Sequence, residues 1–166
     1  MSAPLAERLR PQHLDELIGQ SHLIGKGAVL RRMIDSGRIP SILLWGPPGV
    51  GKTTLANIIA NTLNAPFYKL SAINSGVKDV REVIEKAKNN RFFEASAPIL
   101  FIDEIHRFSK SQQDSLLNAV ETGIVTLIGA TTENPSFEVI RPLLSRCQVY
   151  VLKPLEKKEL EQLLHR

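Results

Sequence analysis

Short apolar runs alternate with segments of helical periodicity from about residue 40 to the end of the chain. The runs lie at 41–45, 67–70, 99–102, 124–128 and 149–152, and each has the length of one buried strand. Between them, apolar residues recur at the spacing of a helix face. This alternation predicts an α/β fold of three layers, with a five-stranded parallel sheet covered by helices on both faces.

The helices are expected where the helical periodicity is clearest. The expected ranges are 28–34, 55–63, 77–87, 111–121 and a short helix from Pro142 to about Arg146. Gly123 would close the fourth helix, because glycine is favoured after a helix end. A proline fits the first turn of a helix and restricts the residue before it, so Pro142 is expected to start a helix rather than interrupt one.

The two ends of the chain differ from this repeating core, which we place at residues 40–153. Residues 1–39 lack the alternation and contain one helical stretch, so we expect an arm packed on the core. Residues 154–166 begin with Pro154 and continue as an amphipathic stretch. They are expected to be the first helix of a second, truncated domain.

Composition excludes several classes of protein. The chain has 166 residues, 43% hydrophobic and 23% charged, which is typical of one globular domain. Its apolar runs are far shorter than the ~20 residues that cross a bilayer, so no membrane association is expected. Met1 to Arg10 contains no signal-peptide core, and the single cysteine fits a reducing compartment. We therefore expect a cytoplasmic protein, and the four scattered histidines do not have the spacing of a zinc site.

Residues 46–53 read GPPGVGKT, the spacing of a phosphate-binding loop between a strand and a helix. Glycines let successive N–H groups point at phosphate oxygens, and the helix N-terminus adds positive potential. Lys52 would reach the outer phosphates of ATP, and the Thr53 hydroxyl would bind Mg²⁺. The residues expected to bind the nucleotide are Pro48, Gly49, Val50, Gly51, Lys52, Thr53 and Thr54.

Two carboxylates follow the apolar run at 99–102. Asp103 and Glu104 would lie at the edge of the sheet where such folds bind ligands. Next to a phosphate-binding loop, Asp103 is expected to hold Mg²⁺ with Thr53, and Glu104 to orient or activate the attacking water.

Two further features have alternative interpretations. Thr131 and Thr132 would bring hydroxyls to the same pocket if their strand lies between the two already named, or they are simply a polar strand end. Arg146 either solvates a helix end or acts on the ATP of a neighbouring subunit as an arginine finger.

Taken together, these residues resemble the AAA+ ATPases. By that resemblance Thr132 occupies the sensor 1 position, and Arg146, between Ser145 and Cys147, matches the trans-acting arginine finger. The segments that contain Arg10-Pro11 and Ile18-Gly19 resemble the part of this superfamily that packs around adenine. The catalytic residues are then expected to be Lys52, Glu104, Thr132 and Arg146.

The continuations of two motifs resemble one family more closely. Residues 103–114, DEIHRFSKSQQD, and 129–137, GATTENPSF, are similar to the RarA/MgsA family of replication-associated recombination proteins, whose eukaryotic members are the Werner-helicase-interacting proteins. Ser109 departs from the asparagine of many members, with little consequence expected. By the same resemblance, the lid domain of the family, with its sensor 2 arginine, and its oligomerisation region are expected to lie outside these 166 residues.

The resemblance implies a DNA-dependent ATPase that acts at stalled forks and DNA ends. It further implies a homotetramer, an association with single-stranded-DNA-binding protein and a place at the nucleoid. The alternatives are a clamp-loader subunit, a Holliday-junction branch-migration motor, a nucleotide-gated binding module with little hydrolysis, or a scaffold stabilised by ATP. His106, Arg107 and Lys110 are either DNA contacts or solvated residues at a helix start. A net charge of +4 is too small to decide between them.

Overall fold

The computed structural model describes residues 28–90 and 97–154. Arg10, Pro11, Ile18 and Gly19, expected near adenine, and the helix expected after Pro154 lie outside the described residues. The strands are β1 (Ser41–Trp45), β2 (Phe67–Ser71), β3 (Ile99–Asp103), β4 (Thr126–Thr131) and β5 (Cys147–Val151). The helices are α3 (Val29–Asp35), α4 (Lys52–Thr62), α5 (Val77–Asn90), the short 3₁₀ helix η2 (Ile105–Arg107), α6 (Lys110–Glu121), α7 (Pro135–Glu138) and α8 (Arg141–Leu144).

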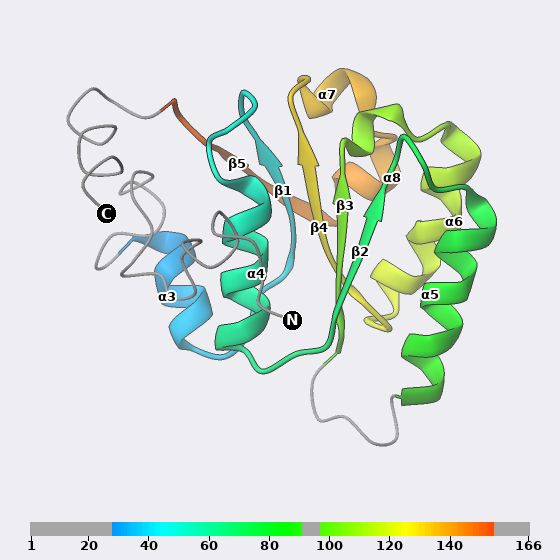
Figure 1. The fold of residues 1–166 in the computed structure, drawn as a ribbon, viewed down its shortest axis with the longest axis horizontal. Coiled ribbons are helices and arrows are strands. Elements are labelled where there is room, and N and C mark those ends of the chain that lie inside the picture. Colours follow the sequence, from blue (N-terminus) through cyan, green and yellow to red (C-terminus); the bar gives the residue numbers. More distant parts are fainter. Residues whose placement is uncertain (1–27, 91–96, 155–166) are drawn as a thin grey trace, which may run out of the picture.

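The five strands form one parallel sheet in the order β2-β3-β4-β1-β5 (Figure 1). The predicted five-stranded parallel sheet is confirmed. Strand β4 lies between β3 and β1, the position that the sequence left conditional. The carboxyl ends of β1, β3 and β4 therefore meet at one edge of the sheet, where open α/β sheets bind their ligands.

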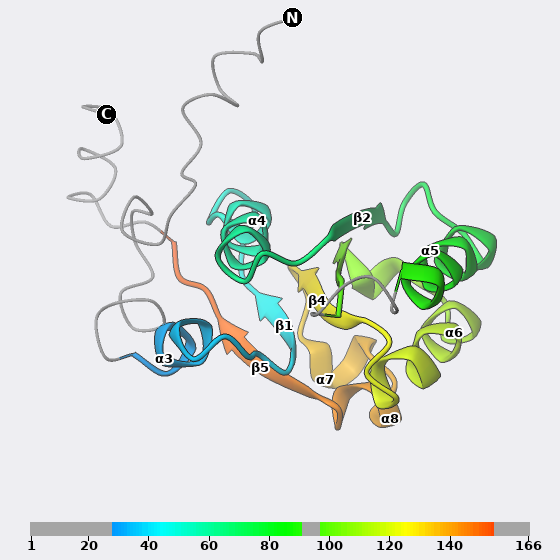
Figure 2. The ribbon, with the colours of Figure 1, turned by 90° about the horizontal axis from the view of Figure 1, so that it is seen from below.

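Helices cover both faces of the sheet, with α3 and α4 on one face and α5, α6 and α8 on the other (Figure 2). Alternate residues of each strand enter the two cores, because side chains of a strand point to opposite faces. Ile42 and Leu44 of β1 pack with α3 and α4, whereas Leu43 between them packs with α5 and α6. The three-layer prediction is confirmed. Among the described helices, none is long and apolar enough to cross a bilayer.

Several element boundaries differ from the predicted ones, and α4 begins at Lys52 rather than at 55. Strand β4 covers Thr126–Thr131 rather than 124–128, because Ile124 and Val125 are buried in the turn that follows α6. Burial in a turn gives the same apolar signal as burial in a strand. Strand β5 begins at Cys147 and ends at Val151, two residues early at its start, and α8 is Arg141–Leu144, so it begins one residue before Pro142.

The start of α6 is held by its own residues. Ser109 accepts a hydrogen bond from Gln112 N at 3.3 Å, and Gln112 Oε1 accepts one from Ser109 N at 2.7 Å. This reciprocal capping box satisfies backbone donors that a helix start leaves free. Serine and asparagine are comparably good N-caps, which agrees with the small consequence expected for serine at this position.

Candidate active site

The loop between β1 and α4 depends on glycine at two positions. Gly51 precedes α4 with a φ of +97°, a left-handed conformation that side chains disfavour. Gly46 donates its N–H to Thr131 O at 3.1 Å. A Cβ at Gly46 would lie 2.7 Å from the backbone oxygen of Leu152. The loop is thus wedged between the ends of β4 and β5, and its curvature follows from its glycines.

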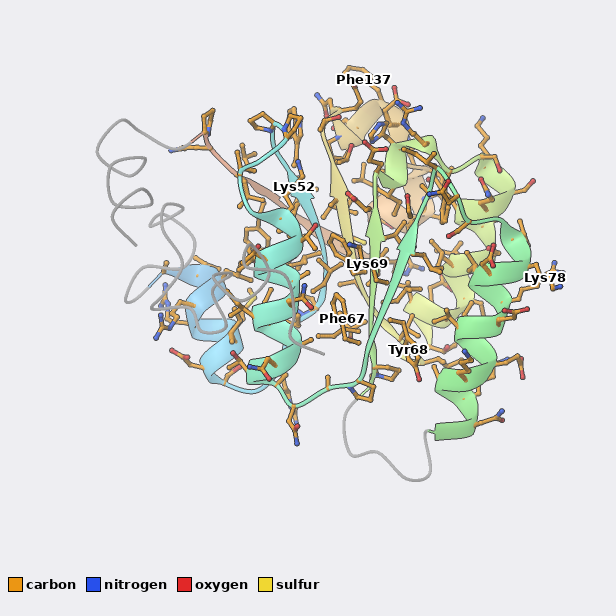
Figure 3. The ribbon with its side chains drawn as sticks, viewed as in Figure 1. Lys52, Phe67, Tyr68, Lys69, Lys78 and Phe137 are labelled. Carbon is orange, nitrogen blue, oxygen red and sulfur yellow. The ribbon has the colours of Figure 1, made fainter. Side chains whose placement is uncertain are left out.

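Lys52 is the first residue of α4, and Figure 3 shows it at the start of that helix, at the carboxyl edge of the sheet. Its Nζ donates to the carbonyl oxygens of Gly46 and Pro47, the second at 3.1 Å. Burial lowers the pKa of this amine, and the negative charges of Asp103 and Glu104 oppose that shift. A partly desolvated ammonium at the start of a helix that follows a glycine-containing loop is suited to the outer phosphates of a nucleotide.

A cavity of about 380 Å³ opens at this edge. It brings together most of the predicted site residues that lie within the described ranges. The lining residues are Pro48, Gly49, Gly51, Lys52, Thr53, Thr54, Asp103, Glu104, Thr131 and Thr132. Val50 is the predicted loop residue that does not line it, because its side chain is buried in the core beneath. Val50 can therefore offer the site only its backbone.

Asp103 and Thr53 supply oxygen ligands to the same cavity. A carboxylate and a hydroxyl are hard donors of the kind that Mg²⁺ accepts, with the remaining positions left to water and phosphate oxygens. Asp103 ends β3 and pairs in register with Ser71 of β2, so the backbone that carries it is fixed by the sheet. The donor set fits the expected magnesium ion.

Glu104 follows directly and has an unusual backbone. Its φ is +54°, uncommon for a residue with a side chain, and it precedes η2. The Oε2 atom is buried and accepts no hydrogen bond from any described residue, while Arg107 Nε lies 3.3 Å from it as an ion pair. Glu104 was predicted from the sequence but its ion pair was not, although opposite charges three residues apart are the signal of such a pair.

The two threonines at the end of β4 have different environments. Thr131 is buried, with its hydroxyl 2.9 Å from Nδ1 of His106, and it also accepts a bond from Glu133 N at 2.9 Å. Thr132 lines the cavity, and its hydroxyl makes no hydrogen bond with the described residues. Thr131 is therefore used structurally, and Thr132 is free to meet a phosphate.

Gln113 is a further positioning residue that sequence reasoning missed. It is buried, and its Nε2 donates to Phe108 O at 3.1 Å and to Glu138 O at 3.0 Å. Its Oε1 accepts from Ile140 N at 2.8 Å. One amide thus joins the end of η2, which follows Asp103 and Glu104, to the segment that leads to Arg146. A glutamine within a helix gives no sequence signal of such burial.

Arg146 does not lie at this cavity. It immediately precedes β5, whose strand runs parallel to β1, so it lies at the amino edge of the sheet. Five residues of strand span roughly 17 Å. The guanidinium is held by Glu121 at 3.0 Å and by the Ser145 hydroxyl at 3.0 Å, with the Arg146 side chain 48% exposed. It therefore cannot serve the cavity of its own chain, but it is available to another molecule.

The phosphate-binding loop, the paired carboxylates and the order of the parallel sheet define a nucleoside-triphosphatase core. The chain belongs to the AAA family, the ATPases associated with various cellular activities, whose pattern matches residues 42–155. The AAA+ fold predicted from sequence is thereby confirmed.

Individual relatives sharpen this classification. The chain is 56% identical over 161 residues to replication-associated recombination protein A of Haemophilus influenzae, covering 97% of this chain and 36% of that protein. It is 52% identical to the ATPase WRNIP1 of Dictyostelium discoideum, covering 99% of this chain and 19% of that one. The resemblance to the RarA/MgsA family is confirmed, and the chain spans about a third of the length of its bacterial relative.

A solved structure is similar over nearly the whole chain. A mutant of RuvB from Thermotoga maritima superimposes with a TM-score of 0.78 at 33% identity, covering 95% of this chain and 54% of that one. Another structure of that protein is described as a Holliday junction branch migration motor. The lower identity makes RuvB a more distant neighbour than the replication-associated recombination proteins.

Proposed function

We propose that this chain is the ATP-hydrolysing core of a replication-associated recombination protein, in which hydrolysis is coupled to DNA. The observation that carries the proposal is the convergence of Lys52, Thr53, Asp103, Glu104 and Thr132 on one cavity. Phosphoryl transfer needs mainly positioning and charge stabilisation, and this set supplies both.

Each group has one task in the proposed reaction. The loop N–H groups and Lys52 bind the β- and γ-phosphates of ATP. Asp103 and Thr53 would hold Mg²⁺, which neutralises charge as it develops on the phosphates. Glu104, which lines the cavity, would accept a hydrogen bond from a water through its carboxylate and orient that water toward the γ-phosphate. Thr132 donates its hydroxyl to the same phosphate.

A second copy completes the site. Arg146 lies at the edge of the sheet away from its own cavity, so we infer that it reaches the ATP of a neighbouring subunit, where a guanidinium stabilises transition-state charge. The proposal therefore includes a homo-oligomer, a tetramer in the full-length protein by the family resemblance. Arg10, Pro11, Ile18 and Gly19 are proposed to contact adenine.

The whole protein is proposed to act on DNA forks and ends, together with single-stranded-DNA-binding protein, in the cytoplasm at the nucleoid. The names of the most similar proteins support this assignment. The branch-migration alternative is supported by the similarity to RuvB, whose identity to this chain is lower. Measuring turnover of the full-length protein with single-stranded, duplex, forked and four-way-junction DNA separates the two, since a branch-migration motor would respond chiefly to the junction.

The decisive variant is Glu104→Gln in the full-length protein, which keeps the size of the side chain but removes the base. We expect ATP turnover to fall by about 10²–10³, with binding of a fluorescent ATP analogue retained. Glu82→Gln, an exposed glutamate of α5 away from the cavity, is the matched control. Unchanged turnover in Glu104→Gln would show that the catalytic assignment is wrong.

Lys52→Ala tests the binding step separately. It removes the cation that meets the phosphates, so we expect nucleotide binding itself to be lost. A nucleotide-gated binding module would lose its function in Lys52→Ala but not in Glu104→Gln, whereas an ATPase loses turnover in both.

A further inference from the structure

The turn after β3 lies directly against β4, because β4 has a glycine at the point of contact. A Cβ at Gly129 would stand 3.1 Å from Cδ1 of Ile105, the first residue of η2, and 2.6 Å from Cδ2 of Leu43. These separations are shorter than ordinary carbon contacts, so a side chain at this position would push η2 away from β4. The two segments that resemble one family, 103–114 and 129–137, therefore contact each other at this point.

This contact brings His106 to the end of β4. Its Nδ1 lies 2.9 Å from the Thr131 hydroxyl oxygen, and the residue is half-buried. The hydrogen bond forms with either tautomer of the ring, because the hydroxyl donates to an unprotonated Nδ1 or accepts from a protonated one. In the second case the hydroxyl proton goes to Glu133 O, at 3.1 Å. His106 is thus directed at β4, unlike Arg107, whose side chain is 59% exposed.

Thr131 connects three parts of the site. Its backbone oxygen accepts the N–H of Gly46 at 3.1 Å, at the start of the phosphate-binding loop. Its hydroxyl accepts the N–H of Glu133 at 2.9 Å, which closes a short turn around Thr132. The same hydroxyl meets His106 in the turn after β3. Because Thr131 is only 1% exposed, its hydroxyl takes its partners from the protein, and these partners fix the direction of the residue that follows.

We propose that His106 is a positioning residue for Thr132. It holds the Thr131 hydroxyl in the orientation that accepts Glu133 N–H, and this turn directs Thr132 to the cavity that it lines. Without His106 the hydroxyl loses one fixed partner, and other orientations of the turn become available. The proposal rests on the proposed function, in which Thr132 donates to the γ-phosphate. Its effect is therefore expected on nucleotides that carry a γ-phosphate and not on ADP.

Nucleotide binding to the full-length protein tests this role without turnover. Thr131→Val nearly keeps the shape of the side chain and leaves the backbone bond to Gly46 in place, but it removes the hydroxyl. The affinity for a non-hydrolysable ATP analogue should fall about three- to tenfold, the range of one net hydrogen bond, while the affinity for ADP stays the same. Thr122→Val is the matched control, because it removes an exposed hydroxyl that donates to Asn118 O at 2.7 Å on α6. It should change neither affinity.

Substitutions of His106 distinguish positioning from general packing. Asparagine carries an amide atom bonded to Cγ, as Nδ1 is in histidine, whereas glutamine places its amide one bond further out. His106→Asn should therefore retain most of the preference for the ATP analogue over ADP, and His106→Gln should lose about three- to tenfold of it. Combining His106→Gln with Thr131→Val should cost no more than Thr131→Val alone, since both act through one hydrogen bond. The kcat of each variant should follow the same order.

The outcomes separate this inference from the proposed function. Equal affinity of Thr131→Val and wild type for the ATP analogue would overturn the positioning role. An equal loss of ADP and analogue binding would also overturn it, because it indicates a disturbed loop. Weaker DNA binding by His106→Gln with a normal nucleotide preference would make His106 a DNA contact instead. In each case Glu104→Gln would still be inactive, whereas normal turnover of Glu104→Gln means that the proposed function itself is wrong.

Discussion

At the carboxyl edge of the sheet, the groups proposed to act on ATP share one cavity and are held by backbone geometry, whereas at the amino edge Arg146 stands on exposed surface beside Glu121. The first edge is made of strand ends and a loop whose glycines allow its path. The second depends on one surface ion pair and one hydroxyl. Under the proposed function, a chain would complete the nucleotide-binding half of the site alone, while Arg146 would act only on the site of a second copy.

The largest expected effect comes from variants that damage one edge of the sheet in one subunit and the other edge in a different subunit. In full-length protein, Arg146→Ala should lower kcat by about 10³, although its own cavity is intact. Mixing it with Lys52→Ala subunits, which keep the arginine but lose nucleotide binding, should restore turnover at the mixed interfaces. Arg141→Ala, an exposed arginine on α8, is the control.

Mixing has a clear contrary outcome. If Arg146→Ala and Lys52→Ala do not complement each other, although each assembles normally by sedimentation, then Arg146 does not act across a subunit boundary. The amino edge would then have only a structural part.

A smaller effect is expected where the carboxyl edge depends on close backbone contact. Gly46→Ala places a Cβ 2.7 Å from Leu152 O, and neither backbone segment can move freely because Gly46 N is bonded to Thr131 O. We expect a loss of about 1–3 kcal/mol in the free energy of unfolding, together with weaker nucleotide binding. Gly123→Ala is an informative control, since its added Cβ meets nothing within 4 Å and its cost comes from a φ of +74° alone.

Denaturant titration of both variants decides the point. Gly46→Ala should weaken nucleotide binding and lower the free energy of unfolding, whereas Gly123→Ala should lower only the free energy of unfolding. Normal nucleotide binding by Gly46→Ala would mean that the loop is not wedged as described.

The two edges also differed in how far the sequence could predict them. The local spacing of the loop at 46–53 and of the carboxylates after 99–102 indicates their chemistry. The structure brings the two together as expected. The pairing of Arg107 with Glu104, and the buried contacts of Gln113, depend on how a turn and a helix pack. The start of β4 was misplaced because an apolar turn and an apolar strand give the same pattern.

The placement of Arg146 illustrates the same limit. Its motif suggested a role in trans, but spacing alone also allowed a solvated helix end. Only the parallel pairing of β5 with β1 puts it at the edge away from its own cavity. Tertiary topology, and not local pattern, carries that information.

Cys147 offers a pH-dependent comparison, because it starts β5 next to Arg146. Burial raises the pKa of its thiol from 9.0 to about 12. In the folded state the thiol keeps the proton that it loses in the unfolded chain. The contribution of Cys147 to the free energy of unfolding is therefore complete below pH 9 and is lost as the pH rises from 9 toward 12. Cys147→Ala should remove the dependence, which amounts to about 1 kcal/mol by pH 9.5.

The measurement is the difference in unfolding free energy between wild type and Cys147→Ala at pH 7.5 and 9.5, which cancels the lysines and tyrosines that both proteins share. Slow alkylation of the native thiol at pH 8 is expected for the same reason. A difference that stays constant with pH would show that the thiol is solvated, and with it that the start of β5 is less well packed than the loop edge.

The smallest effect concerns Glu121, which positions the proposed arginine finger. The pair is partly exposed, with side-chain exposures of 48% for Arg146 and 35% for Glu121, so its energy is about 0.2–1 kcal/mol. Glu121→Gln should therefore lower kcat of the oligomer by only about two- to fivefold, with KM for ATP unchanged.

Mixed with Lys52→Ala subunits, Glu121→Gln should recover, since intact arginines from the other subunit then serve its sites. Mixed with Arg146→Ala subunits, it should remain impaired, because the only arginines available are its own. A loss that both mixtures restored equally would place the effect of Glu121 in general stability and not in the orientation of Arg146.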